Sequence, residues 1–218
     1  MISVIAPVRA RTQMLATMLA SLEQTAEQQV EVVLRCDYDD DEMIAYLRRR
    51  GWHQPMVFGP RLNGYASVPR FINEAARLAT GDLILVVNDD AVFETPGWDV
   101  MLEQEAAKFR DGVFLFGVRT LNEGNFPFTC VSRKFVDALG FVVDERLIYT
   151  DVWARDVLQR FDRVKMVEVS IKHDWQGMSP DQTAAQKLTI TPEYAALYAK
   201  CVEEGQDRVR DFLLRRVA

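Results

Sequence analysis

Short apolar runs alternate along the chain with segments whose apolar residues recur every three or four positions. The short runs predict buried strands, and the three-to-four spacing predicts amphipathic helices. The strands that we expect are Ile2 to Ala6, Val30 to Leu34, Met56 to Phe58, Leu83 to Val87, Val113 to Val118 and Val164 to Ile171. Alternating strands and helices are typical of βα units, so the predicted fold class is α/β, with a mostly parallel central sheet flanked by helices.

Capping residues and prolines mark where several of the expected helices begin and end. The starting signals are Ser67 with Pro69, Thr95 with Pro96, Ser132, Thr150, and Thr191 with Pro192. Gly81 and Gly140 end two of these helices. The polar, irregular stretch from Gly177 to Thr191 is predicted to form a lid.

The bulk composition indicates one globular domain without a membrane anchor. The chain has 218 residues, of which 49% are hydrophobic, and no apolar run approaches the roughly 20 residues that span a bilayer. The three cysteines show no CxxC spacing, which argues against a zinc site and a disulfide framework. We therefore expect a cytoplasmic protein. Its oligomeric state is not predicted.

The charge of the chain bears on its partners. A formal net charge of −6 argues against broad binding to a polyanion. Arg48 to Arg50 and the arginines near the C-terminus could form a local basic patch, so a nucleic-acid acceptor stays open, although a solvated helix face is the interpretation that we favour.

The triplet Asn88-Asp89-Asp90 follows the most apolar of the expected strands. In open α/β sheets, ligands bind at the carboxyl ends of the strands. Asn88 and Asp90 can point to the same side as oxygen ligands, which suits Mg²⁺ or Mn²⁺ held with substrate phosphates. An Asn- and Asp-rich turn is also common without any metal, so the triplet alone leaves both interpretations open.

The wider context of the triplet resembles the GT-A glycosyltransferases of the family 2 type. The stretch from Asn73 through Ala79, Gly81 and Asp82 to Asn88-Asp89-Asp90 is similar to the family segment that ends in N-x-D or D-x-D, and Pro96-Gly97-Trp98 follows as P-G-W. The resemblance implies a Rossmann-like GT-A fold that binds a nucleotide-diphospho-sugar. It also implies that Asp90 is the essential metal ligand. Asn88 takes the variable first position of the N-x-D motif, and Asp89 lies in the donor site.

Two further landmarks lie on the N-terminal side of this segment. The opening Ser3 to Arg9 resembles the family's first strand, whose end borders the nucleotide, so Pro7 and Arg9 are assigned to donor binding. Asp37 matches the acid that contacts the uracil or ribose, and Asp39 is a second candidate. For Asp39 to Asp41, a helix N-terminus that favours acidic residues is the competing interpretation.

The C-terminal half adds landmarks in the family order, so that the resemblance covers roughly residues 2 to 175. Leu139 to Glu145 resembles L-G-G-F-D-E, and Thr150-Asp151 stands where the family has E-D. The resemblance implies that Asp151 is the general base and that His173 is a metal ligand or phosphate contact. Thr150 and Ile72 depart from the family pattern. His173 could instead be a hydrogen-bonding residue at a strand end.

The resemblance implies an inverting, metal-dependent transfer of a sugar to an acceptor hydroxyl. The donor is a UDP-sugar by default, and the acceptor is a glycan, a small molecule or a modified nucleic acid.

Residues 1–176 would form the GT-A domain, with a nucleotide-sugar half (1–98) and an acceptor half (99–176). Residues 177–218 would be a flexible segment and C-terminal helices packed on the same domain. The acceptor surface is expected at Asn122 to Thr129 and after Trp175. Trp98, Trp153 and Trp175 are either sugar or base platforms or core residues.

Two other functions compete with transfer. A nucleotidyltransferase that makes the nucleotide-sugar would need a glycine-rich, basic loop after the first strand, and this chain has Arg9 and Arg11 there without the glycines. A degenerate sugar- or nucleotide-binding protein of the same fold would bind a donor without turning it over.

Overall fold

A computed structural model describes residues 1–62, 64–120, 127–148, 150–174 and 190–215. Its centre is one eight-stranded sheet in the order β3-β2-β1-β4-β7-β6-β8-β5. The strands are β1 (Ile2–Val8), β2 (Glu31–Asp37), β3 (Met56–Gly59), β4 (Leu83–Val86), β5 (Ala91–Phe93), β6 (Leu115–Arg119), β7 (Thr129–Ser132) and β8 (Val164–His173). In this described sheet, β7 and β5 run antiparallel to the other strands, so the predicted mostly parallel α/β sheet is confirmed.

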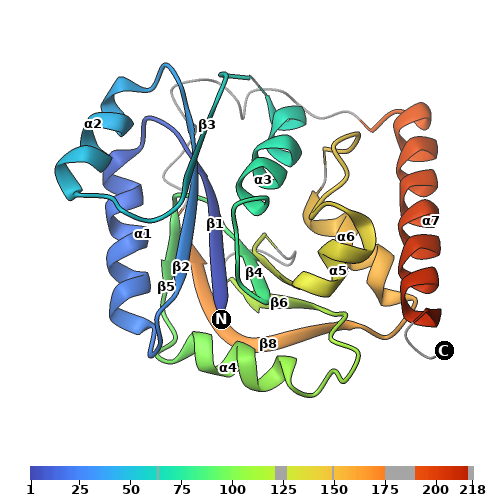
Figure 1. Cartoon of the computed structure of the whole chain (residues 1–218). Helices are drawn as coiled ribbons and strands as arrows, with labels where there is room; N and C mark the ends of the chain where they lie inside the picture. The colour runs from blue at the N-terminus through green and yellow to red at the C-terminus, as the bar shows by residue number, and fades with distance from the viewer. Residues whose placement is uncertain (63, 121–126, 149, 175–189, 216–218) are drawn as a thin grey trace.

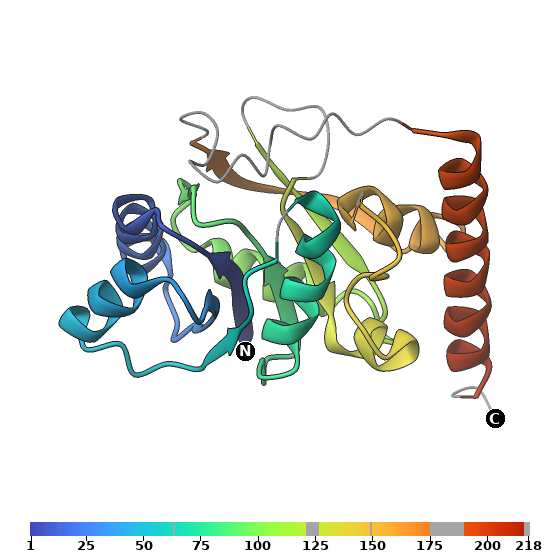
Figure 2. The same ribbon diagram turned by 90° about the horizontal axis from the view of Figure 1, so that it is seen from above.

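Helices cover both faces of the sheet, as Figures 1 and 2 show. They are α1 (Thr12–Thr25), α2 (Asp41–Arg50), α3 (Val68–Ala76), α4 (Trp98–Ala106), α5 (Arg133–Leu139), α6 (Thr150–Gln159) and α7 (Pro192–Leu214), with a short 3-10 turn, η1 (Tyr65–Ser67), before α3. Helices α1, α2 and α4 bury their apolar residues against one face, and α3, α5 and α6 against the other. Helix α7 packs outside α5 and α6.

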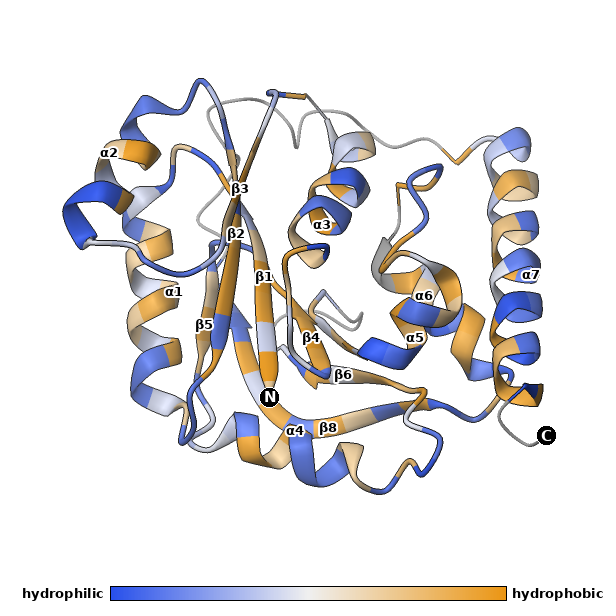
Figure 3. Cartoon of the chain, viewed as in Figure 1, coloured by the Kyte–Doolittle hydropathy of each residue, from blue (hydrophilic) through white to orange (hydrophobic). Residues whose placement is uncertain are grey.

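The apolar stripes that predicted the helices face the sheet. In α1 the inward residues are Leu15, Met18, Leu19 and Leu22, all buried, and Figure 3 shows apolar residues along the strands as well. Two of the tryptophans left open by the sequence are core residues, because Trp98 and Trp153 have no exposed surface. In the described part of the chain, no helix combines the length and apolar character that a membrane span requires.

Several predicted helix ends are confirmed by their caps. The Ser132 hydroxyl accepts a hydrogen bond from the backbone N–H of Phe135 at 3.2 Å, and Gly140 ends α5 in the left-handed conformation with φ of 83°. Thr191 caps α7 in the same way as Ser132 caps α5. The helix expected from Thr95 begins instead at Trp98, after Gly97, whose φ of 70° turns the chain. The predicted lid lies almost wholly outside the described residues.

Strands β5 and β7 were not expected from the sequence. Strand β7 reads Thr-Cys-Val-Ser, without a long apolar run, yet all four residues are buried because it lies between β4 and β6. Thr129 and the preceding Phe128 are buried, although they end the segment, Asn122 to Thr129, that was expected to form the acceptor surface. Residues 122–126 of that segment lie outside the described part of the chain. Strand β5 has only three residues, and it pairs with the end of β8.

Asn73 links α3 to the loop that follows α5. From α3, its side-chain oxygen accepts hydrogen bonds from the N–H groups of Val142 and Val143 at 3.0 and 3.2 Å. Its side-chain nitrogen donates to the carbonyl of Val143 at 2.9 Å and to Glu145 at 3.0 Å. Because Asn73 is buried, these bonds fix the loop that leads toward α6.

Replacing Asn73 with alanine is expected to destabilise the fold by about 2–4 kcal/mol, because two buried N–H groups lose their acceptor. Urea unfolding followed by circular dichroism measures this change. Glu145→Gln is the matched control: it keeps an acceptor for Asn73 on a partly exposed side chain, and it should alter the unfolding free energy by less than about 0.5 kcal/mol. A loss below about 1 kcal/mol for Asn73→Ala would show that the loop does not depend on this side chain.

Candidate functional site

Charged side chains gather where β1, β2, β4 and β8 end. Arg9 and Arg11 follow β1, Asp37 ends β2, Asp89 and Asp90 follow β4, and His173 ends β8. These strands run in the same direction. Their carboxyl ends therefore meet at one edge of the sheet, which is where α/β folds bind ligands.

Arg11 links the two acids that follow β4. Its Nε lies 3.0 Å from Oδ2 of Asp89, its Nη2 contacts Oδ1 of Asp89, and its Nη1 lies 3.1 Å from Oδ2 of Asp90. Both carboxyl groups are buried. Burial raises the pKa of Asp89 to about 7, and the Arg11 guanidinium opposes that shift. The two buried carboxyl groups thus hold the guanidinium of Arg11 between them.

His173 reaches Asp90 because of the register between β5 and β8. Ala91 pairs with His173, and the N–H of Asp174 donates to the carbonyl of Asp90 at 2.9 Å. The imidazole Nε2 then lies 3.2 Å from Oδ1 of Asp90. Burial works to raise the pKa of Asp90, but His173 and Arg11 outweigh it, and the pKa lies below its usual value. Asp90 is therefore held as a carboxylate.

Asp90 and His173 fit a divalent metal ion. Although Oδ1 of Asp90 lies close to His173, it makes no well-directed hydrogen bond among the described residues, and it is buried. Adjacent ligands on an octahedral ion with bonds of about 2.1 Å lie about 3 Å apart, which is close to the spacing of Oδ1 and Nε2. Within the described chain, no group of three or more His, Cys, Asp and Glu residues forms a ready cage. Any ion held here would take further ligands from water or substrate.

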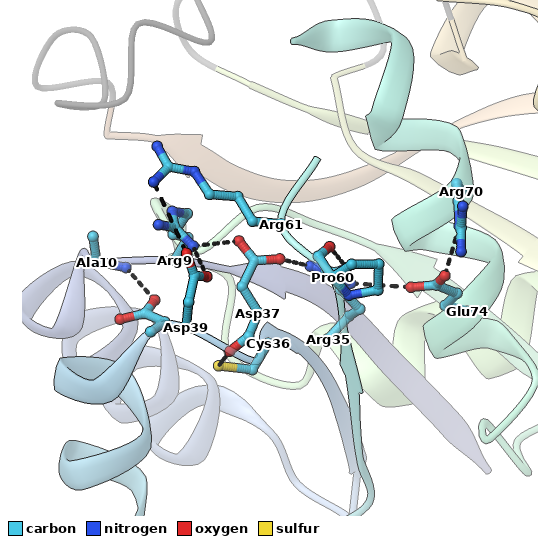
Figure 4. A network of polar contacts seen from close by, with 11 residues as sticks. Arg9, Ala10, Arg35, Cys36, Asp37, Asp39, Pro60, Arg61, Arg70 and Glu74 are labelled. Atoms are coloured by element: carbon cyan, nitrogen blue, oxygen red, sulfur yellow. Dashed lines mark hydrogen bonds and ion pairs between the residues drawn. The ribbon is translucent and has the colours of Figure 1, made fainter. Parts of the chain in front are cut away.

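A second network surrounds Asp37 (Figure 4). Oδ2 of Asp37 accepts from Arg9 at 2.6 Å, and Oδ1 pairs with the buried Arg35. Arg35 also donates to Glu74 and to the carbonyl of Pro60, and its guanidinium stacks 3.8 Å above the ring of Phe71. Both carboxylate oxygens of Asp37 are thus engaged within the protein.

The acids after β2 divide into two roles. Asp40 caps α2 by accepting from the N–H of Met43, and Asp41 lies in the first turn, as the helix-terminus interpretation predicted. Asp39 instead pairs with Arg9 at 2.9 Å, which lowers its pKa, and its side chain is 53% exposed. Asp39 and Asp41 are both exposed, and Asp39 is the one that pairs with Arg9.

The segment between β1 and α1 is tightly constrained. Ala10 has a φ of 55°, which is unfavourable for a residue with a Cβ, and its N–H donates to Asp40 at 2.7 Å. The N–H of Arg11 donates to the carbonyl of Arg9 at 2.7 Å. Such strained residues persist where surrounding contacts fix them, and they cluster at ligand sites. These bonds fix the backbone that carries Arg9 and Arg11.

Sequence reasoning did not assign Arg11 to the site. Its partners lie 78 and 79 positions away, and no local pattern reports such a pairing. A basic residue just after β1, opposite the acids that follow the neighbouring β4, was the available signal. Arg11 and Asp90 also line an open hollow of about 370 Å³ beside the start of α1.

The remaining predicted residues are placed as follows. Pro7 lies within β1 and pairs with Arg35 of β2, and Asn88 is half-buried, with its carbonyl accepting from the N–H of Ala91. Asp151 is the second residue of α6, but its side chain is outside the described part of the chain. Whether it faces Asp90 therefore stays a prediction.

Comparisons with solved structures place the fold. The chain aligns with the mannosyltransferase PcManGT from Pyrobaculum calidifontis in complex with GDP-Man and Mn²⁺ (TM-score 0.66, 12% identity, covering 99% of this chain and 74% of that one). It also aligns with S. aureus TarS 1-349 in complex with UDP-GlcNAc (0.65, 12%, 97% and 71%). Glucosyl-3-phosphoglycerate synthase from Mycobacterium tuberculosis, in complex with Mn²⁺, UDP and phosphoglyceric acid, aligns similarly (0.62, 14%, 92% and 78%).

At these identities the likeness shows the fold, and the predicted GT-A fold is confirmed. No protein-family model and no curated protein matches the sequence. The more specific family 2 assignment stays a prediction.

Proposed function

We propose that this protein is a metal-dependent glycosyltransferase that moves a sugar from a nucleoside-diphosphate sugar to an acceptor hydroxyl. The observation that carries the proposal is the buried Asp90 carboxylate, whose Oδ1 lies 3.2 Å from Nε2 of His173 and has no well-directed hydrogen bond within the residues that the structure describes. This pair lies at the strand ends of a fold shared with glycosyltransferases whose structures contain Mn²⁺ and nucleotides. A divalent ion held by such groups can stabilise the charge on a leaving diphosphate.

Asp90 and His173 would hold Mn²⁺ or Mg²⁺ through one oxygen and one nitrogen. The bound ion would supply a Lewis acid for the charge that develops on the leaving diphosphate. The chain's own part is to hold both ligands rigidly: Asp90 by the turn after β4, and His173 by its pairing with β5. Holding the ligands in place before the donor arrives is the usual source of such electrostatic stabilisation.

Asp151 is proposed to be the general base. Its position in the first turn of α6 places it at the positive end of a helix, which favours the ionised carboxylate. It would take the proton of the acceptor hydroxyl as that oxygen attacks the anomeric carbon from the face opposite the leaving group. One displacement of this kind inverts the anomeric centre.

The donor nucleotide is proposed to lie over the ends of β1, β2 and β4, beside Pro7, Arg9, Asp37, Asp39, Asn88 and Asp89, with UDP as the default. The Asp37 side chain is only 4% exposed, and Arg9 and Arg35 contact its two oxygens, so Arg9 would have to move aside for the nucleotide to reach Asp37. Asp39 is the more accessible acid. We therefore assign the direct contact to Asp39 and a supporting role to Asp37.

The acceptor class stays open among glycans, small molecules and modified nucleic acids. The three cysteines are free and buried, which fits a reducing compartment, so we assign the reaction to the cytoplasm.

A panel of nucleotide-sugars tests the proposed function. We expect slow hydrolysis of one donor in the presence of Mn²⁺, with the loss of this activity on adding EDTA and its return when Mn²⁺ is restored. Metal-dependent binding of a donor without any turnover would instead indicate a degenerate binding protein. Formation of a nucleotide-sugar from a sugar phosphate and a nucleoside triphosphate would indicate the nucleotidyltransferase.

A further inference from the structure

We propose that Arg11 is a second cation of the donor site, which binds the diphosphate beside the metal ion. This inference rests on the proposed function and extends it to a residue that the sequence resemblance did not assign. Three observations carry it: the way Arg11 is anchored, the donors that it retains, and its position on the same carboxylate as the metal site.

Asp89 anchors the guanidinium. Nε and Nη2 of Arg11 meet the two oxygens of Asp89 side by side, which is the paired geometry that a guanidinium and a carboxylate favour. The Asp89 side chain is 2% exposed, and the segment after β1 is fixed by the N–H bonds of Ala10 and Arg11. The guanidinium is thus held in one place before any ligand arrives.

Within the described part of the chain, the contacts of Arg11 leave some of its N–H donors for a ligand. A guanidinium has five N–H groups, and the contacts to Asp89 and Asp90 use three of them. The side chain is 24% exposed, and it borders the hollow beside Asp90. A phosphate oxygen that approaches this edge would find charge-assisted donors already oriented.

Arg11 and the proposed metal ion would each use a different oxygen of Asp90. Nη1 of Arg11 lies 3.1 Å from Oδ2, whereas Oδ1 and Nε2 of His173 are the groups that would hold the metal ion. A diphosphate bound beside Asp90 would then be within reach of both Arg11 and the ion. Arg11 would therefore act on the phosphates and leave the metal ligands in place.

Isothermal titration with Arg11→Gln tests the proposal against a purely structural role. We expect the affinity for UDP at saturating Mn²⁺ to fall by about 10- to 100-fold, since a charged contact is lost. The affinity for Mn²⁺ alone should not fall. Uridine, which lacks the phosphates, should bind the variant as it binds the parent in saturation-transfer NMR. GDP and guanosine replace UDP and uridine if GDP binds the parent more tightly.

Two further variants and a control complete the test. Arg11→Lys keeps the charge without the planar fork, and it should lose less UDP affinity than Arg11→Gln. Asp89→Asn frees the guanidinium from its anchor and should also weaken UDP binding at saturating Mn²⁺, so the test does not depend on one variant folding. Arg50→Gln removes an exposed arginine paired with Glu23 and should change nothing.

The outcomes separate this inference from the proposed function. If Arg11→Gln binds UDP as well as the parent does, or loses UDP only in proportion to a loss of Mn²⁺, Arg11 is not a diphosphate contact. If the parent binds none of UDP, GDP, ADP, CDP and TDP in the presence of Mn²⁺, the proposed function itself fails.

Discussion

Replacing Asp90 with alanine is expected to abolish metal-dependent nucleotide binding, with UDP affinity in the presence of Mn²⁺ falling by about 100-fold or more. Outer groups that merely orient metal ligands are worth 10- to 100-fold in metal affinity, and Asp90 is proposed to be a ligand itself. UDP binding in the presence of EDTA should stay unchanged, because the nucleotide contacts proposed for the ends of β1 and β2 would remain. Isothermal titration with and without Mn²⁺ measures both quantities.

Asp82 offers a matched control for Asp90. It precedes β4, whereas Asp90 follows it, and its side chain is 88% exposed. Asp82→Ala should leave Mn²⁺-dependent binding of UDP as it is in the parent. If Asp90→Ala also keeps that binding, the ion is held elsewhere and the assigned metal site is wrong.

The second large effect is a loss of turnover, which we expect when Asp151 is replaced. Asp151→Asn removes the proton acceptor while keeping the size of the side chain, so turnover should fall by about 10²- to 10⁴-fold. The affinity for the donor should stay within about twofold, because the proposed base would contact the acceptor rather than the nucleotide. Donor hydrolysis, in which water takes the place of the acceptor, gives the rate without knowledge of the acceptor.

Asp156 provides the comparison on the same helix. It accepts a hydrogen bond from Tyr198 at 2.8 Å and pairs with Arg155, so its role lies in the packing of α7 on α6. Asp156→Asn should therefore retain the parent's turnover. An Asp151→Asn variant that binds donor normally and hydrolyses it as fast as the parent would remove Asp151 from the mechanism.

Local patterns were sufficient for most elements of the fold. The unbroken run of five apolar residues from Leu83 indicates a strand that is buried on both faces. The apolar residues of α1 recur every three or four positions, which indicates a helix buried on one side. Strand β7 lacks such a signal, because its burial comes from insertion between two strands that are distant along the chain. Strand β5 is too short to show a period.

In the candidate site, too, some residues could be predicted from the sequence and others depend on contacts between distant segments. The sequence marked Asp90 and His173 by resemblance, and the pairing of β5 with β8 explains why two residues 83 positions apart lie together. The role of Arg11 depends on contacts across β1 and β4, which no local pattern encodes. The engagement of both Asp37 oxygens likewise follows from side-chain packing around Arg35.

Anomalous diffraction from crystals soaked with Mn²⁺ and UDP tests the central claim most directly. The account predicts one manganese peak within bonding distance of Oδ1 of Asp90 and Nε2 of His173, with the UDP phosphates completing its ligands. A manganese peak bound to other residues, or ordered UDP at this edge of the sheet without manganese beside Asp90, would contradict it.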